Sequence, residues 1–128
     1  MRGTQKGLSL MEIMIALVIV AIIGGMAYPR YQKMIARSRQ TEAKTILQAV
    51  FMGQDLYQTT NQVFSGKLED LDVQIPSNAK YTYSVSVNEN GSTFLAKAVS
   101  NIDSDAAIDE WQIDENNQLK NVINDVIE

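Results

Sequence analysis

The chain has 128 residues, with 11 basic and 15 acidic side chains, a formal net charge of -4, no histidine and no cysteine. Without histidine it lacks the usual general base near neutral pH and the commonest metal ligand; without cysteine it lacks thiol nucleophiles, zinc–thiolate sites and disulfides. Basic residues crowd the first part of the chain, and acids dominate after Phe51. Because acidic surfaces repel phosphate backbones, we expect no nucleic-acid binding by that later part.

Residues 8–28 form the run LSLMEIMIALVIVAIIGGMAY, which is apolar apart from Ser9 and Glu12. About 20 helical residues, each rising 1.5 Å, cross the core of a bilayer. The run has no polar stripe, unlike a helix that lies on a membrane surface. We therefore predict a membrane-spanning helix over residues 8–29.

Three residues near the far end of this helix, Gly24, Gly25 and Pro29, oppose helix formation. Glycine lowers helix stability by about 1 kcal/mol and an interior proline by about 3 kcal/mol. The sequence therefore predicts a bend or a melted stretch at these positions.

Beyond Pro29 the apolar residues recur at helical spacing, which predicts a helix that continues in water to about residue 60. The predicted buried stripe comprises Ala36, Ala43, Ile46, Leu47, Val50 and Tyr57. Charged side chains lie mostly off this stripe, at Arg37, Arg39, Glu42 and Lys44.

Two later segments, residues 80–87 and 93–100, alternate in polarity and are expected to form antiparallel strands. The turn signal Asn88-Glu89-Asn90-Gly91 between them is rich in residues that tolerate positive φ. We expect a third strand at residues 111–114 and a fourth at 119–123, with a helix over 120–127 as the alternative to the fourth. The expected fold class is α+β: a long N-terminal helix packed on a small antiparallel sheet of three to four strands.

The stretch Lys6-Gly7-Leu8-Ser9-Leu10-Met11-Glu12, directly before the apolar run, resembles the signature of type IV prepilins. The resemblance extends to about Tyr57 and includes Pro29. It implies that a prepilin peptidase/methyltransferase cleaves after Gly7 and methylates the new amino terminus at Leu8. Leu8 replaces the phenylalanine that is usual in the family, an apolar exchange.

The resemblance also implies the pilin fold, divided into three regions. Residues 1–7 would be the leader, residues 8–29 the transmembrane and filament-core helix, and residues 30–128 the globular head.

Glu12 is a charged residue within the otherwise apolar predicted span, so hydropathy does not account for its presence there. A carboxylate at bilayer depth costs about 2.5–3.5 kcal/mol on insertion scales, so we expect a neutralising partner. The family resemblance implies pairing with the Leu8 amine of a neighbouring subunit. The alternative is that Glu12 lies close to the headgroups and extends toward them without further function.

The resemblance implies a structural role rather than catalysis, without cofactors or metals. Before assembly the precursor would be inserted in the bacterial inner membrane, in contact with lipid, with its head outside the cytoplasm. It would then polymerise with identical copies into a surface pilus, driven by an assembly platform and an ATPase. The implied uses of such a filament are twitching motility, adhesion and DNA uptake.

The charge distribution opposes the implied orientation. The five basic residues from Arg30 to Lys44 outnumber Arg2 and Lys6, a balance that by counting alone would keep the head in the cytoplasm. An outside head is therefore an expectation from the family resemblance alone.

Several alternatives stay open. A secretory signal peptide cut after Gly25-Met26-Ala27 would release a soluble head that begins at Tyr28. A membrane-tethered enzyme or sensor would need a catalytic or phosphate-binding motif, which the sequence does not offer.

Within the superfamily, the chain could be a minor pilin or a pseudopilin of a type II secretion system. Major pseudopilins carry a calcium loop, for which Asp103, Asp105 and Asp109 are candidate oxygen ligands. A solvated acidic loop is the alternative for these three residues.

Overall fold

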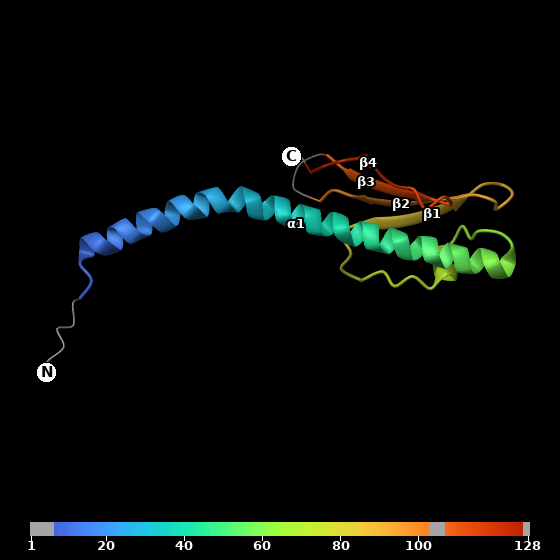
Figure 1. The fold of residues 1–128 in the computed structure, drawn as a ribbon, viewed down its shortest axis with the longest axis horizontal. Coiled ribbons are helices and arrows are strands. Elements are labelled where there is room, and N and C mark those ends of the chain that lie inside the picture. Colours follow the sequence, from blue (N-terminus) through green and yellow to red (C-terminus); the bar gives the residue numbers. More distant parts are fainter. Residues whose placement is uncertain (1–6, 103–106, 127–128) are drawn as a thin grey trace, which may run out of the picture. The chain divides into compact units, whose positions relative to one another are not determined.

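The computed structural model describes residues 7–102 and 107–126. Helix α1 (Leu10–Asn61) is followed by the short 3-10 helix η1 (Leu68–Leu71) and by four strands, β1 (Thr82–Val87), β2 (Phe94–Ser100), β3 (Asp109–Asp114) and β4 (Leu119–Ile123), as Figure 1 shows. The chain divides into two compact units, Met1–Met34 and Ile35–Glu128. The boundary falls slightly beyond residue 29, where we expected the membrane helix to end.

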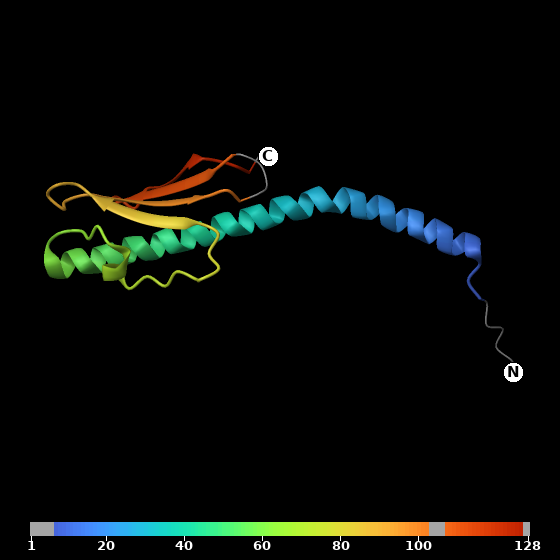
Figure 2. The ribbon, with the colours of Figure 1, turned by 180° about the vertical axis from the view of Figure 1, so that it is seen from behind.

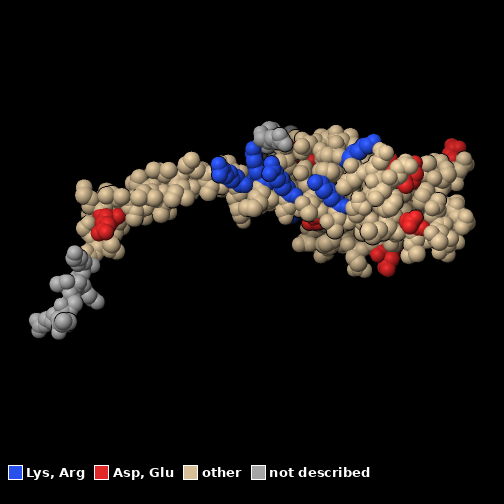
Figure 3. Space-filling view, in the orientation of Figure 1, with Lys and Arg blue, Asp and Glu red and all other residues tan. Residues whose placement is uncertain are grey.

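The first unit contains the apolar part of α1. Its large side chains are exposed, from 46% at Ile13 to 79% at Leu10. By length and composition, α1 is the one helix among the described residues that could cross a membrane. The surface of this part is uncharged in Figure 3 except for an acidic group near its start.

The predicted melted stretch is absent from this structure, because α1 is helical through Gly24, Gly25 and Pro29. An interior proline crowds the carbonyl four residues earlier and leaves it without a donor. Here that residue is Gly25, which is exposed. The helix continues through Pro29, so of the two predicted forms only a bend is compatible with this structure.

In the second unit, α1 is amphipathic and covers one face of the sheet (Figures 1 and 2). The predicted stripe is confirmed: Ala43, Ile46, Leu47 and Val50 are buried, and Ala36 and Tyr57 pack partly buried against the same core. Two buried glutamines, Gln40 and Gln54, were not expected on this face. The Gln54 amide accepts from Ser65 N at 2.9 Å and donates to Ser65 O at 2.6 Å, which fastens the segment after α1 to the helix.

The sheet has the order β1-β2-β3-β4, with each pair antiparallel. The predicted alternation is confirmed in β2, where Phe94, Ala96 and Ala98 are buried. In β1, Tyr83 is buried, Val85 is half-buried and Val87 is exposed, so the buried face ends before the strand does.

The structure corrects the sequence-based predictions for the two later strands. Strand β3 begins at Asp109 rather than at residue 111, because residues 109 and 110 pair with Ser100 and Val99 of β2. Residues 119–123 form β4, and residues 124–126 are not helical. The helical alternative is therefore wrong over residues 120–126.

The turn between β1 and β2 forms as predicted. The Asn88 amide accepts from Ser92 N and donates to the Ser92 hydroxyl, each at 2.8 Å. Gly91 has φ +64, and a Cβ there would lie 2.9 Å from Val63 Cβ. Glycine is thus required both by the backbone conformation and by the close approach of the segment that follows α1.

Candidate assembly and processing site

Helix α1 begins with a reciprocal pair of contacts between Ser9 and Glu12. Glu12 N donates to Ser9 Oγ at 3.2 Å, and Ser9 N lies 3.4 Å from Glu12 Oε2. Ile13 N donates to Ser9 O at 3.2 Å, as the first bond of the helix. This arrangement is a capping box, which satisfies amide donors that a helix start leaves free. The S-x-x-E spacing was visible in the sequence, but we considered Glu12 only as an assembly residue or as a side chain without further function near the headgroups.

The predicted cleavage site lies immediately before this capping box. Gly7 and Leu8 are non-helical and exposed, and the Leu8 side chain is 72% exposed. A Cβ on Gly7 would meet no atom within 4 Å, so no other part of the described chain crowds this position. Lys6 and the rest of the predicted leader lie outside the described residues.

Glu12 itself is exposed and has no basic partner among the residues that the structure describes; Ser9 is its hydrogen-bond partner there. The capping contact supplies a dipolar donor and no opposite charge. A lipid environment therefore still requires a counter-charge for this carboxylate from outside the described part of the subunit.

The candidate calcium ligand Asp109 has a different role from the predicted one. Its side chain is fully buried at the start of β3. Oδ1 accepts from Gln40 Nε2 at 2.9 Å, Asn121 Nδ2 at 3.1 Å and Asp125 N at 3.2 Å. Oδ2 accepts from the Tyr81 hydroxyl at 2.6 Å and from Trp111 Nε1 at 2.7 Å.

These five donors surround Asp109 as they would a bound anion. A cation needs free oxygen lone pairs, whereas here N–H and O–H groups occupy them. Both predicted roles for this residue, a calcium ligand and part of a solvated loop, are therefore wrong. Asp103 and Asp105 lie outside the described residues, and no cluster of three acids suited to a metal occurs in the described part.

The Asp109 contacts hold the C-terminal segment to the rest of the head. They join α1, β3, β4 and the residues after β4, and Gln40 Nε2 also donates to Asn124 Oδ1 at 3.1 Å. Trp111 of β3 is half-buried, and Lys44 Nζ lies 4.4 Å from its ring centre. The C-terminal segment is thus held by hydrogen bonds, and the chain, which has no cysteine, cannot hold it by a disulfide.

Two tyrosines near this network resist ionisation. Burial raises the pKa of Tyr81, and the hydrogen bond to Asp109 raises it further, because phenolate would face a carboxylate. Burial also raises the pKa of Tyr83, with the charge of Glu42 as a smaller cause. Tyr83 differs from Tyr81 in that its hydroxyl has no hydrogen-bond partner in the described part of the chain.

Two family models match the chain. Residues 40–120 match the type IV pilin-like G and H family, and residues 2–28 match the prokaryotic N-terminal methylation motif. The second match covers the predicted cleavage site and the apolar run.

Individual proteins agree with these matches. The chain is 32% identical over 82 residues to the type IV major pilin protein PilA of Myxococcus xanthus, which is 64% of this chain and 37% of that protein. It is 29% identical over 98 residues to the fimbrial protein EcpC of Eikenella corrodens, covering 77% and 64% of the two chains. The matched region therefore spans less than two thirds of either relative.

The fold also resembles a solved structure. A type IV pilin from Shewanella oneidensis aligns with a TM-score of 0.51 and 19% identity, over 66% of this chain and 89% of that one. At this identity the likeness concerns the fold alone. Together with the family match over most of the head and the methylation motif before it, the fold identifies the chain as a member of the type IV pilin family.

Proposed function

We propose that this chain is the structural subunit of a pilus filament, made as a membrane-anchored precursor and displayed on the cell surface after assembly. The observation that carries the proposal is the exposure of the whole apolar part of α1, which lies within the methylation-motif match at residues 2–28. In the precursor this surface contacts lipid, and in the filament it contacts the same helix of other copies. The role is mechanical and not enzymatic, which the family membership supports.

Processing would occur after Gly7, followed by methylation of the Leu8 amine by the peptidase. The exposed, non-helical backbone at these residues supports access by such an enzyme. Once freed, the Leu8 amine of one subunit would pair with Glu12 of a neighbour and supply the missing counter-charge. An assembly platform and an ATPase would provide the work of extraction from lipid, and the filament would serve motility, adhesion or DNA uptake.

The test is the intact mass and N-terminal sequence of protein sheared from cells. A chain that begins at methylated Leu8 supports this pathway. A chain that begins at Tyr28 would instead mean a secreted head without its helix, and would exclude the filament model. As a control, replacing Gly7 with a bulky residue should leave the precursor uncut in the membrane.

The proposed orientation, with the head outside the cytoplasm, can be tested separately. The chain has no cysteine, so Ser84→Cys in β1 introduces a single thiol at an exposed position. A membrane-impermeant maleimide should label this variant in cells whose outer membrane alone is permeable. Labelling that appears only after the inner membrane is broken would place the head in the cytoplasm, as the count of basic residues suggests.

A further inference from the structure

The end of the predicted span carries basic side chains that neither the proposed processing nor the proposed pairing uses. No lysine or arginine occurs between residues 7 and 29, whereas Arg30 and Lys33 follow directly and are exposed. In Figure 3 the uncharged stretch of α1 accordingly ends at the first blue side chains. From Leu10 to Tyr28 the helix rises about 27 Å at 1.5 Å per residue, close to the ~30 Å of the hydrocarbon core of a bilayer. Arg30 and Lys33 therefore fall at the level of the lipid phosphates.

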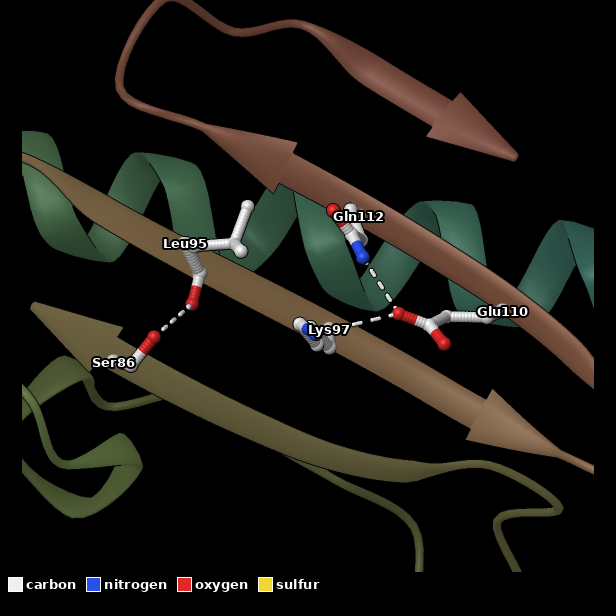
Figure 4. Close-up of polar contacts among 5 residues, drawn as sticks. All are labelled: Ser86, Leu95, Lys97, Glu110 and Gln112. Atoms are coloured by element: carbon white, nitrogen blue, oxygen red, sulfur yellow. Dashed lines mark hydrogen bonds and ion pairs between the residues drawn. The ribbon is translucent and has the colours of Figure 1, made fainter. Parts of the chain in front are cut away.

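These two cations have no acidic partner in the described ranges 7–102 and 107–126. Lys97 on the sheet shows the contrast, because its Nζ lies 3.5 Å from Glu110 Oε1, to which Gln112 Nε2 also donates at 2.6 Å (Figure 4). Basic groups next to a membrane that are not neutralised within the chain attract the anionic groups of the lipid surface. The charge at residues 30 and 33 thus favours an anionic ligand.

Arg30 also lines an open groove along the same turns of α1. The other residues that line this groove are apolar or aromatic, and they include Ile23, Met26, Ala27, Tyr31 and Met34. Because their spacing is mostly three or four positions, they share one face of the helix. Along this face the apolar side chains come first, and the guanidinium follows about one turn after Met26. A phospholipid has the same order, with its acyl chains inside the bilayer and its phosphate at the surface.

Two tyrosines indicate the depth of this face in the membrane. Tyr28 and Tyr31 are 64% and 60% exposed, and aromatic rings with a polar end lie at the boundary between hydrocarbon and headgroups. The Tyr28 hydroxyl accepts a hydrogen bond from Gln32 Nε2 at 2.7 Å, so its polar end already has a partner on the helix. The guanidinium of Arg30 therefore lies where a phosphate, and not an acyl chain, meets it.

We propose that this face of α1, within residues 23–34, binds one anionic phospholipid of the bilayer. The phosphate pairs with Arg30 and Lys33, and an acyl chain runs along Met26 and Ile23. The guanidinium matches a phosphate with two parallel N–H donors, and the ammonium three positions later adds a second positive charge within reach. A zwitterionic lipid is the poorer ligand, because its own cationic headgroup neutralises its phosphate. The inference rests on the membrane-anchored precursor of the proposed function and requires no filament.

The test measures lipid binding to the uncut precursor in detergent micelles by native mass spectrometry. Phosphatidylglycerol is the anionic probe, and phosphatidylcholine with the same acyl chains is the zwitterionic one. We expect the unaltered chain to bind phosphatidylglycerol at least about tenfold more tightly, since each basic residue near an anionic lipid surface contributes about fivefold. Equal binding of the two lipids would overturn the proposal.

Charge removal at the two basic positions tests the phosphate contact. Arg30→Gln and Lys33→Gln change exposed side chains, so the fold of the head, followed by Trp111 fluorescence, should be unchanged. Each variant should lose about fivefold in affinity for phosphatidylglycerol and nothing for phosphatidylcholine. Lys120→Gln is the matched control, since Lys120 is exposed on β4 and its loss changes the net charge equally. An equal loss in this control would mean a nonspecific effect of charge and would contradict the site.

The groove is tested separately from the charges. Ala27→Phe fills it without altering a charge and should weaken the binding of phosphatidylglycerol. Ile22→Phe is the control, because Ile22 is 58% exposed on another face of the helix and should leave binding unchanged. Glycerol 3-phosphate, which has the phosphate without acyl chains, should not compete at equal concentration. Competition by this compound would mean a site for free phosphate esters and would overturn the binding of lipid.

Failure of this inference and failure of the proposed function are distinguishable. A precursor that does not enter the membrane contradicts the proposed function, and the lipid site falls with it. A precursor that enters the membrane and is processed, but binds both lipids equally, contradicts the lipid site alone.

Discussion

Ser9 and Glu12 contact each other in both directions at the start of α1, with Glu12 N 3.2 Å from Ser9 Oγ and Ser9 N 3.4 Å from Glu12 Oε2. The carboxylate of Glu12 thus has a local capping role in addition to the assembly role that we propose for its charge. The two roles make different demands, because glutamine can also complete a capping box but carries no charge.

The first prediction separates these roles by substitution at Glu12. Glu12→Gln keeps the capping acceptor and removes the charge, and Glu12→Ala removes both. We expect both variants to insert in the membrane and neither to form filaments, as seen by electron microscopy of sheared material. Ser9→Ala, which keeps the charge and costs about 1 kcal/mol at the helix start, should still assemble. Normal filaments from Glu12→Gln would show that capping, and not charge pairing, explains this residue.

The second prediction concerns Asp109. In Asp109→Asn an amide donor replaces an oxygen that accepts two or three hydrogen bonds, and each buried donor left unpaired costs about 1–3 kcal/mol. Chemical unfolding of the detergent-solubilised chain can be followed by fluorescence of Trp111, the one tryptophan in the sequence. We expect the denaturant concentration at the unfolding midpoint to fall. Amide hydrogen exchange should become faster first in residues 119–126.

Glu110→Gln is the control for Asp109→Asn. It removes the same charge from the adjacent residue, whose partner Lys97 is 40% exposed. A partly exposed ion pair contributes about 0–1 kcal/mol, so the change should be small. Equal destabilisation by both variants would contradict a special role for Asp109.

The third prediction concerns Gly53, where α1 passes close to η1. A Cβ at this position would lie 2.7 Å from Leu71 O, a backbone atom that cannot move alone. Gly53→Ala should therefore destabilise the head by about 1–3 kcal/mol, despite the better helix propensity of alanine. Gly66→Ala is the comparison, since its Cβ would meet only Val87 Cγ2 at 3.4 Å. Thermal unfolding of the two variants side by side measures the difference.

The fourth prediction concerns alkaline pH. The pKa values of Tyr81 and Tyr83 are raised in the folded chain above the ordinary value of 10.0, so above about pH 10 the unfolded state loses protons that the folded state keeps. Stability from these tyrosines is thus fully present below about pH 10 and is lost as the pH rises further.

Unfolding midpoints measured between about pH 9 and pH 11, one unit either side of the ordinary tyrosine pKa, should show this decline. Tyr83→Phe should weaken the decline with little effect at neutral pH, because its hydroxyl has no partner in the described chain. Tyr81→Phe should destabilise at every pH, because Asp109 loses a donor. A profile for Tyr83→Phe identical to that of the unaltered chain would contradict the link between its burial and the alkaline loss.

Local patterns in the sequence determined much of the fold. The stripe around Leu47 repeats with the period of a helix and the alternation from Phe94 to Ala98 with the period of a strand, and both are confirmed. The apolar run has no such period, but its length and composition predicted the helix that forms there. The methylation motif is a contiguous segment, and a family model matches it at the predicted place. The proposed processing and pairing at Gly7, Leu8 and Glu12 stay predictions, because they involve an enzyme and a second subunit.

Only the tertiary structure decided the role of Asp109. In the sequence it stands among other acids, whereas in the fold its carboxylate meets Gln40, 69 residues away along the chain. Contacts of that separation depend on how the helix and strands pack, and no local spacing encodes them. The same holds for the exposed side chains of Met52 and Leu56, because one side of the helix is known to be uncovered only once the sheet is seen to cover the other. The sequence by itself thus determined the long apolar helix, the order of the strands and the methylation motif, because each depends on residues close together in the chain. Packing decided which polar side chains became buried and which apolar side chains stayed exposed.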